Sequence, residues 1–228
     1  MKSFLSISLC CLSAMALVCG CGNNAKKAAD KAAAEKAAAD SIAKAEQTQR
    51  TMDKIAKLPE EPVFDIITNM GEIKVKLYSK TPKHRQNFEK LALEKYYDGT
   101  LFHRVINGFM IQGGDPLTRD TANVKLYGTG GPGYTIPAEF VPEYKHKMGA
   151  LAAARRGDVA NPLKESSGSQ FYIVQNPAAC AQLDGQYTVF GETIEGIDVV
   201  NKIAAMPVDA VDRPLQDVRI VTIKLDEK

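Results

Sequence analysis

Several residue types and patterns are scarce or missing in this chain, and each absence removes a class of protein. The 228 residues contain no Trp, and 29 Lys and Arg nearly balance 27 Asp and Glu, which leaves a net charge of +2. So small an excess gives no electrostatic reason to expect a nucleic-acid partner. The only histidines, His84, His103 and His146, lack the spacing of metal ligands, so we expect no metal ion.

Cysteine is scarce outside the first 21 residues. Of the five cysteines, four lie at or before Cys21, and Cys180 stands alone in the rest of the chain. A single cysteine cannot form an internal disulfide framework. We interpret Cys180 as a small buried apolar residue rather than a nucleophile, because no positioned base is evident near it.

The N-terminus has the pattern of an export signal. Phe4–Val18 is apolar, follows Lys2, and is shorter than the roughly 20 residues that a membrane span needs. It ends in Val18-Cys19-Gly20-Cys21, which resembles the bacterial lipobox and implies cleavage before Cys21, followed by lipidation of that residue. We expect a signal peptide over 1–20 and a lipid-anchored protein of the bacterial cell envelope. The alternative is a soluble secreted protein cut by ordinary signal peptidase.

Residues 25–58 contain neither Gly nor Pro and are rich in Ala, Lys and Glu, which favour helix. Opposite charges recur at i,i+4, as in Lys31–Glu35 and Lys36–Asp40. We expect a helical spacer within a lipid-anchored segment over 21–61. Its eight basic and five acidic side chains leave +3, so it is either a solvated arm, a surface for anionic lipid, or an interaction surface for a partner. Pro59 and Pro62 mark the boundary to a domain over 62–228.

The domain has many short strand patterns, few helices and no regular alternation of strand and helix. Alternation of apolar and polar residues, or short apolar runs, predict strands over 63–68, 72–78, 148–154, 170–174, 188–192 and 218–223. Helical periodicity predicts helices over about 82–97 and 197–205. This order predicts a mainly β fold: a closed antiparallel β-barrel capped by two α-helices and preceded by the helical spacer.

The stretch Phe102–Asp115 places polar side chains among large apolar ones. Arg104 and Gln112 stand beside Phe102, Val105, Ile106, Phe109, Met110 and Ile111. A charged side chain is rarely buried without a partner, so the pattern indicates a pocket in which Arg104 meets a ligand. The Gly-rich run 128–133 lacks the Gly-Lys-Ser/Thr ending of a phosphate-binding loop, and we interpret it as a structural loop.

Five blocks in order resemble the cyclophilin-type peptidyl-prolyl cis-trans isomerases. They are Phe102-His103-Arg104-Val105-Ile106, Gly108–Asp115, Gly168–Ile173, Leu183-Asp184-Gly185 and Val189-Phe190-Gly191. The resemblance covers Val63–Leu225 and implies an eight-stranded antiparallel barrel. It implies an enzyme that isomerises X-Pro bonds, here in exported polypeptides, without cofactor or metal; we expect a monomer.

The resemblance also implies the roles of individual residues. Arg104 is the catalytic residue, whose guanidinium stabilises the twisted amide, and Gln112 binds the substrate backbone. The proline pocket and the peptide-binding edge are completed by Phe109, Met110, Tyr172, Leu183, Tyr187, Ala154, Arg155 and Gln170.

Three positions depart from common family members. Tyr172 replaces Phe and is expected to make the pocket edge more polar; Gln182 replaces a Trp of many eukaryotic members, and Tyr187 replaces a His. These departures keep a second hypothesis open, in which the domain is a proline-peptide-binding chaperone module with low turnover.

Overall fold

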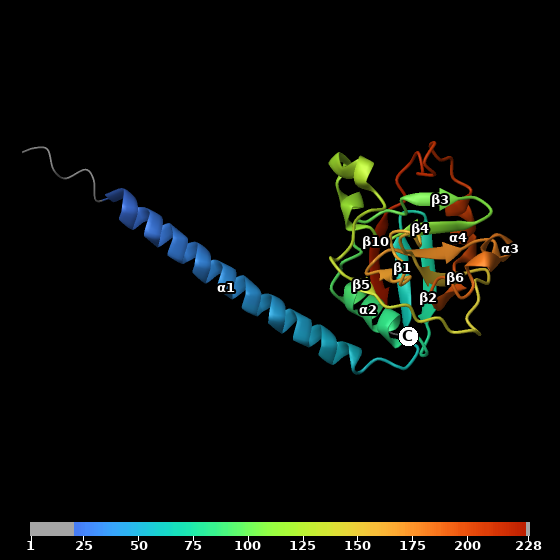
Figure 1. Ribbon diagram of the computed structural model, residues 1–228, viewed down its shortest axis with the longest axis horizontal. Helices are drawn as coiled ribbons and strands as arrows, with labels where there is room; N and C mark the ends of the chain where they lie inside the picture. The colour runs from blue at the N-terminus through green and yellow to red at the C-terminus, as the bar shows by residue number, and fades with distance from the viewer. Residues whose placement is uncertain (1–20, 227–228) are drawn as a thin grey trace, which may run out of the picture. The chain divides into compact units, whose positions relative to one another are not determined.

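A computed structural model describes residues 21–226 of the chain (Figure 1). The helices are α1 (Cys21–Ile55), α2 (Pro82–Leu93), α3 (Pro177–Cys180) and α4 (Ile197–Ala204), with short 3-10 helices η1 (Pro116–Arg119), η2 (Thr121–Leu126) and η3 (Ala181–Leu183). The strands are β1 (Val63–Thr68), β2 (Gly71–Leu77), β3 (Arg104–Ile106), β4 (Met110–Gly113), β5 (Thr135–Ile136), β6 (Ala150–Ala153), β7 (Ser166–Ser167), β8 (Phe171–Val174), β9 (Val189–Glu195) and β10 (Ile220–Leu225).

Eight strands form one curled antiparallel sheet in the order β10-β1-β2-β9-β6-β8-β4-β3. The expected closed barrel is therefore wrong in one respect, because the end strands β3 and β10 form no continuous ladder with each other. The segments just before them meet through an isolated Leu101–Arg219 bridge and the bonds from Phe102 N to Val218 O and from Ile220 N to Thr100 O. A turn then interrupts the pairing, which leaves the barrel half open.

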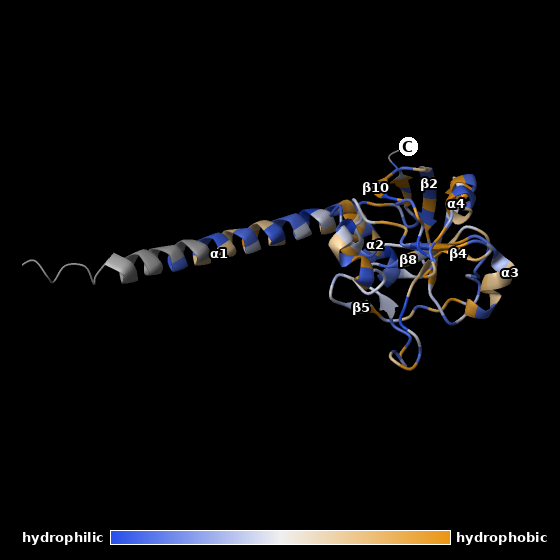
Figure 2. Ribbon diagram, turned by 90° about the horizontal axis from the view of Figure 1, so that it is seen from above, coloured by the Kyte–Doolittle hydropathy of each residue, from blue (hydrophilic) through white to orange (hydrophobic). Residues whose placement is uncertain are grey.

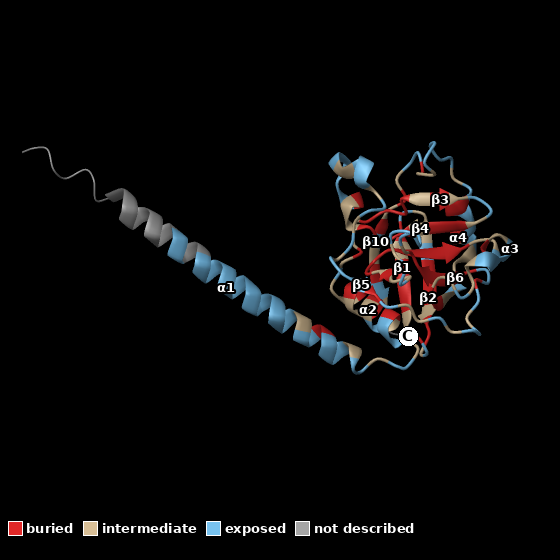
Figure 3. Ribbon diagram, viewed as in Figure 1, coloured by how far each residue is buried: buried red, intermediate tan, exposed pale blue. Residues whose placement is uncertain are grey.

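The hydrophobic core is built from buried residues of the sheet and of α2, and Figures 2 and 3 show hydrophobic and buried residues along these elements. Alternation along the strands places Ile66, Val75 and Ile173 there with no exposed surface. Phe88, on the buried face of α2, packs edge-to-face against Phe64 and Phe171. Apolar burial of this kind is the main term that stabilises the fold.

The two predicted helices are present as α2 and α4, but α2 is shorter than the periodicity suggested. Pro82 occupies its first turn, where a missing N–H is tolerated. The helix ends at Leu93 because Lys95 takes a left-handed conformation, with φ 60°, and Tyr96 N donates to Leu91 O. This reversal buries the neighbouring Tyr97 in the core.

The chain divides after Arg50 into two compact units. Over its described length α1 is mostly exposed and carries the ion pairs Lys31–Glu35 and Arg50–Glu46, each at 3.7 Å. The second unit begins at Thr51 and includes Leu58, which packs on the core. Among the described residues, no helix combines the length and apolar character of a membrane span. The predicted signal peptide over 1–20 lies outside them, and so does the side chain of Cys21.

Candidate functional site

Strand register brings residues from four strands into one row on the outer face of the sheet. Arg104 on β3 lies opposite Gln112 on β4, Gln112 lies opposite Tyr172 on β8, and Tyr172 lies opposite Ala152 on β6. Because side chains alternate along a strand, Val105, its cross-strand partner Ile111 and the next partner Ile173 point to the core instead. Arg104 and Gln112, near each other in the sequence, thus share a face with a residue from a distant block.

Beside this row lies a second apolar cluster, separate from the core. Met110 and Tyr172 are buried in it together with Cys180, and three predicted pocket residues border it as partly buried side chains: Phe109, Leu183 and Tyr187. Burial raises the pKa of the Cys180 thiol to about 11, so it behaves as an apolar residue at neutral pH. The five predicted residues of the proline pocket are therefore brought together.

The hydroxyl of Tyr172 belongs to a chain of hydrogen bonds that the sequence did not reveal. It lies 2.8 Å from His146 Nε2, and His146 Nδ1 lies 2.8 Å from Asp184 Oδ1. Burial lowers the pKa of His146. Burial acts to raise the pKa of Asp184, but hydrogen bonds from His146 outweigh this effect and lower it. Neutral His146 therefore donates from Nδ1 to the carboxylate and accepts the Tyr172 proton at Nε2.

This arrangement overturns the expectation of a more polar pocket edge. Tyr172 is only 4% exposed, and its hydroxyl is engaged with the buried His146. Its ring stacks on His146 at 5.9 Å between centroids and meets Tyr187 edge-on at 6.0 Å. Tyr172 thus presents an aromatic face to the pocket, as a Phe would, and directs its hydroxyl into the protein.

A hydrogen bond to Gln170 holds the side-chain amide of Gln112 in place. Gln112 Nε2 donates to Gln170 Oε1 at 3.0 Å, and Gln170 Nε2 donates in turn to the carbonyls of Gly128 and Gly130. The Gly-rich loop is held on its other side by the fully buried Asp115, whose carboxylate accepts from the backbone N–H groups of Gly128 and Gly130. A Cβ on Gly130 would lie 2.1 Å from Asp115 Oδ1, which explains the glycine. The loop supports the site, and these two N–H groups are already bonded.

A cleft of about 860 Å³ opens beside the row and is lined by Gln112, Gln170, Ala154 and Arg155, together with the Gly-rich loop and the rim loop that contains Asn161. Both backbone groups of Ala154 are bonded within the protein: its N–H donates to Gln170 O and its carbonyl accepts from Ser167 N. Ala154 therefore lines the cleft without free backbone groups, and its predicted place on the peptide-binding edge stays a prediction. The backbone N–H and C=O of the next residue, Arg155, have no hydrogen-bond partner within the described part of the chain.

The side chain of Arg155 has a structural role beneath the rim of the cleft. It is 4% exposed, and Nε donates to Gln186 O at 2.9 Å while Nη1 contacts Asp158 at 2.5 Å. Its guanidinium lies 4.3 Å from the ring centroid of Tyr187, in cation–π geometry. It ties the rim loop to one wall of the pocket.

Arg104, the predicted catalytic residue, stands at the edge of the sheet rather than buried. Its side chain is 43% exposed, and Nε lies 3.6 Å from Oδ2 of Asp212, in the loop before β10.

Sequence reasoning missed Asp212, His146 and the partnering of Asp184 because each meets its partner across the fold. Gln182 is exposed and bonds locally to Ala179 O. Among the described residues, no group of three or more His, Cys, Asp or Glu side chains is arranged to hold a metal ion.

Comparison with known proteins places this geometry in one family. The family model described as "Cyclophilin type peptidyl-prolyl cis-trans isomerase/CLD" matches residues 63–225. Peptidyl-prolyl cis-trans isomerase B of Streptomyces anulatus is 39% identical over 180 residues, which cover 71% of this chain and 94% of that protein. Peptidyl-prolyl cis-trans isomerase-like 2 of Rhizopus delemar is 40% identical over 176 residues, which cover 74% of this chain but 30% of the longer relative.

A solved structure agrees with the fold. The cyclophilin type peptidyl-prolyl cis-trans isomerase of Cryptosporidium parvum, crystallised in the presence of the dipeptide Ala-Pro, superposes with a TM-score of 0.64 at 33% identity. The match covers 73% of this chain and 99% of that one.

Proposed function

The chain belongs to the family of cyclophilin-type peptidyl-prolyl cis-trans isomerases, and from that membership we propose that it isomerises X-Pro bonds in polypeptides at the site around Arg104. One observation carries the assignment of the site: Arg104, Gln112 and Tyr172 form a continuous row across three strands, flanked by the apolar cluster. A proline ring needs an apolar wall, and the flanking peptide needs polar groups beside it. The cluster supplies the apolar wall and the row supplies the polar groups.

The reaction rotates an amide bond against a barrier of ~18–20 kcal/mol, because the twisted state loses resonance. In that state the prolyl nitrogen becomes pyramidal and regains a lone pair. A guanidinium donor near this nitrogen favours the twisted state over both planar isomers, which is what lowers a barrier. Arg104 fits this role because it stays charged and offers several N–H donors.

The rest of the site holds the substrate while the bond turns. Met110, Phe109 and the ring of Tyr172 grip the pyrrolidine ring, and the amide of Gln112 binds the peptide backbone. The open backbone groups of Arg155 lie along the cleft, where an extended peptide adds a strand-like pairing. No covalent intermediate forms, and no acid or base is required.

A prolyl-peptide isomerisation assay on residues 22–228 tests the mechanism. We expect Arg104→Ala to lower kcat/KM by at least about tenfold, in line with the loss of one transition-state donor. Arg50→Ala, which removes the same charge from α1, is the matched control and is expected to leave the rate unchanged.

Unaltered activity in Arg104→Ala would refute this mechanism. NMR exchange spectroscopy on an Ala-Pro peptide separates isomerase from binding module: rapid cis–trans exchange supports the enzyme. Tight binding with slow exchange would instead support the chaperone alternative, which the departures at Gln182 and Tyr187 motivate.

We also propose that the protein is a lipid-anchored monomer of the bacterial cell envelope, acting on exported proline-containing polypeptides and assisting their folding. The support is the N-terminal sequence: Lys2, the apolar run Phe4–Val18 and the lipobox-like residues ending at Cys21. Two or three acyl chains on Cys21 give firm membrane attachment, whereas one chain binds only marginally.

A further inference from the structure

The loop between α4 and β10 runs along the free edge of β3, the strand that carries Arg104. Val105 N donates to Asp212 O at 2.8 Å, and nearby Phe102 N donates to Val218 O at 2.9 Å. The loop thus occupies backbone groups that an edge strand would otherwise present to solvent. It also brings Asp212 beside Arg104.

The backbone around Asp212 is held by a tight turn. Asp209 Oδ1 accepts from Val211 N at 2.9 Å and from Arg213 N at 3.0 Å, and Asp209 N donates to Arg213 O at 2.8 Å. A bridge between Val208 and Pro214 closes the turn. Asp212 takes φ 63°, a left-handed conformation that Asp and Asn adopt more readily than other residues with a Cβ.

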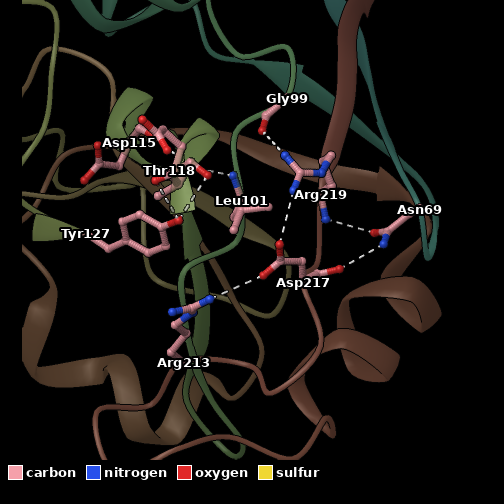
Figure 4. A network of polar contacts seen from close by, with 10 residues as sticks. Asn69, Gly99, Leu101, Asp115, Thr118, Tyr127, Arg213, Asp217 and Arg219 are labelled. Atoms are coloured by element: carbon pink, nitrogen blue, oxygen red, sulfur yellow. Dashed lines mark hydrogen bonds and ion pairs between the residues drawn. The ribbon is translucent and has the colours of Figure 1, made fainter. Parts of the chain in front are cut away.

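The next residue anchors this turn to the body of the domain (Figure 4). Arg213 Nη2 lies 3.6 Å from Asp217, which contacts Arg219 at 3.1 Å, and Arg219 N donates to Asn69 Oδ1 at 2.9 Å. The Arg213 guanidinium also lies 5.1 Å from the ring centroid of Tyr127. The turn is therefore tied, through the Asp212 carbonyl and through Arg213, to parts of the domain that are distant in sequence.

The Asp212 carboxylate lies 3.6 Å from Arg104 Nε, and both side chains are a little over 40% exposed. An exposed ion pair between two mobile side chains contributes little to stability. Here, however, one partner is short and its backbone is bonded to the strand that carries the other. The contact therefore bears on the orientation of the long Arg104 side chain, while its contribution to stability is small.

We propose that Asp212 is a positioning residue for the isomerase reaction: its carboxylate holds the Arg104 guanidinium in the orientation that meets the prolyl nitrogen. This rests on the proposed function, in which Arg104 stabilises the twisted amide. Asp212 itself touches no reacting atom. Without it, Arg104 distributes over several rotamers, and fewer molecules are ready to stabilise the twisted state.

The test is a double-mutant cycle in the full chain, with kcat and KM measured separately. Asp212→Asn retains the left-handed preference and removes only the charge. We expect kcat to fall about three- to tenfold, with KM nearly unchanged, because an orienting contact rather than a binding contact is lost. Asp212→Gly, which also fits φ 63°, is expected to show the same loss and guards against a folding defect in either variant. Asp198→Asn, an exposed position on α4, is the matched control.

The decisive comparison is the Arg104→Ala background. If Asp212 acts through Arg104, Asp212→Asn has no further effect there. An equal loss in both backgrounds, or no loss in the wild type, would overturn the positioning role while leaving the function of Arg104 intact. A rise in kcat would overturn it as well. A fully active Arg104→Ala variant would instead overturn the proposed mechanism and, with it, this inference.

Discussion

At the scale of single residues, the hydroxyl of Tyr172 shows how a substitution in a pocket can leave the pocket's surface unchanged. The hydroxyl lies 2.8 Å from His146 Nε2, inside the protein. Leaving a buried acceptor without a hydrogen-bond donor lowers the free energy of unfolding by roughly 1–3 kcal/mol. The side chain therefore contributes an aromatic face to the pocket and a hydrogen bond to the interior.

From this we expect Tyr172→Phe to change kcat/KM by less than about threefold while lowering the free energy of unfolding by roughly 1 kcal/mol. The pKa of His146, which burial lowers in the folded protein, should rise in this variant because neutral Nε2 loses its donor. Kinetics, urea unfolding and NMR titration of the His146 ring measure the three effects.

Tyr187→Phe removes the neighbouring hydroxyl and serves as the control for Tyr172→Phe. A loss of activity beyond tenfold in folded Tyr172→Phe would contradict this account, because it would mean that the hydroxyl acts on the substrate.

At the scale of one element, α2 carries an acidic residue on its buried face. Glu89 is 2% exposed, with Arg85 Nε 3.5 Å away as its ion-pair partner. Burial raises the pKa of Glu89 to about 7, although Arg85 opposes the shift. The folded protein therefore keeps a proton on Glu89 at pH values where the unfolded chain has lost it.

The free energy of unfolding should consequently fall as pH rises from about 4.5 to 7, because the folded state binds the extra proton in that range. We expect Glu89→Gln to stabilise the domain by roughly 2 kcal/mol at pH 8 and to have little effect near pH 4.5. Urea unfolding at both pH values measures this difference.

Glu72→Gln, at an exposed position on β2, is the control for Glu89→Gln. Equal effects of Glu89→Gln at the two pH values would show that Glu89 is ionised throughout this range in the folded protein.

At the scale of the whole molecule, the proposed catalysis and the proposed membrane attachment use separate parts of the chain. The compact unit from Thr51 onward contains every predicted substrate-binding residue and the described neighbours of Arg104. The proposed membrane attachment depends on Cys21 alone. Location and catalysis should therefore respond to different substitutions.

We expect Cys21→Ser to move the protein from the membrane fraction to the soluble fraction of the producing bacterium and to abolish labelling by radioactive palmitate. Its kcat/KM on a short proline peptide should match that of the unaltered protein in detergent. The same substitution at Cys19 is the control. Retention of Cys21→Ser in the membrane fraction, or labelling that persists, would refute anchoring through this residue.

Local sequence was sufficient for much of this protein. The motif blocks identified the family, and the period-two patterns located most of the large strands. The same blocks assigned Arg104 and Gln112 to one site, and the structure places them opposite each other on a short hairpin. The apolar residues of the proline pocket followed from the same blocks.

Tertiary structure decided what depends on register between distant segments. It showed that the backbone of Ala154 is already bonded while that of Arg155 is open, that the Tyr172 hydroxyl faces His146, and that Asp212 lies beside Arg104. It also showed the sheet to be curled but not closed by a continuous ladder. Periodicity reports which side of a strand a residue occupies, whereas these contacts depend on which loop crosses the edge of the sheet and on where each hydrogen bond is used.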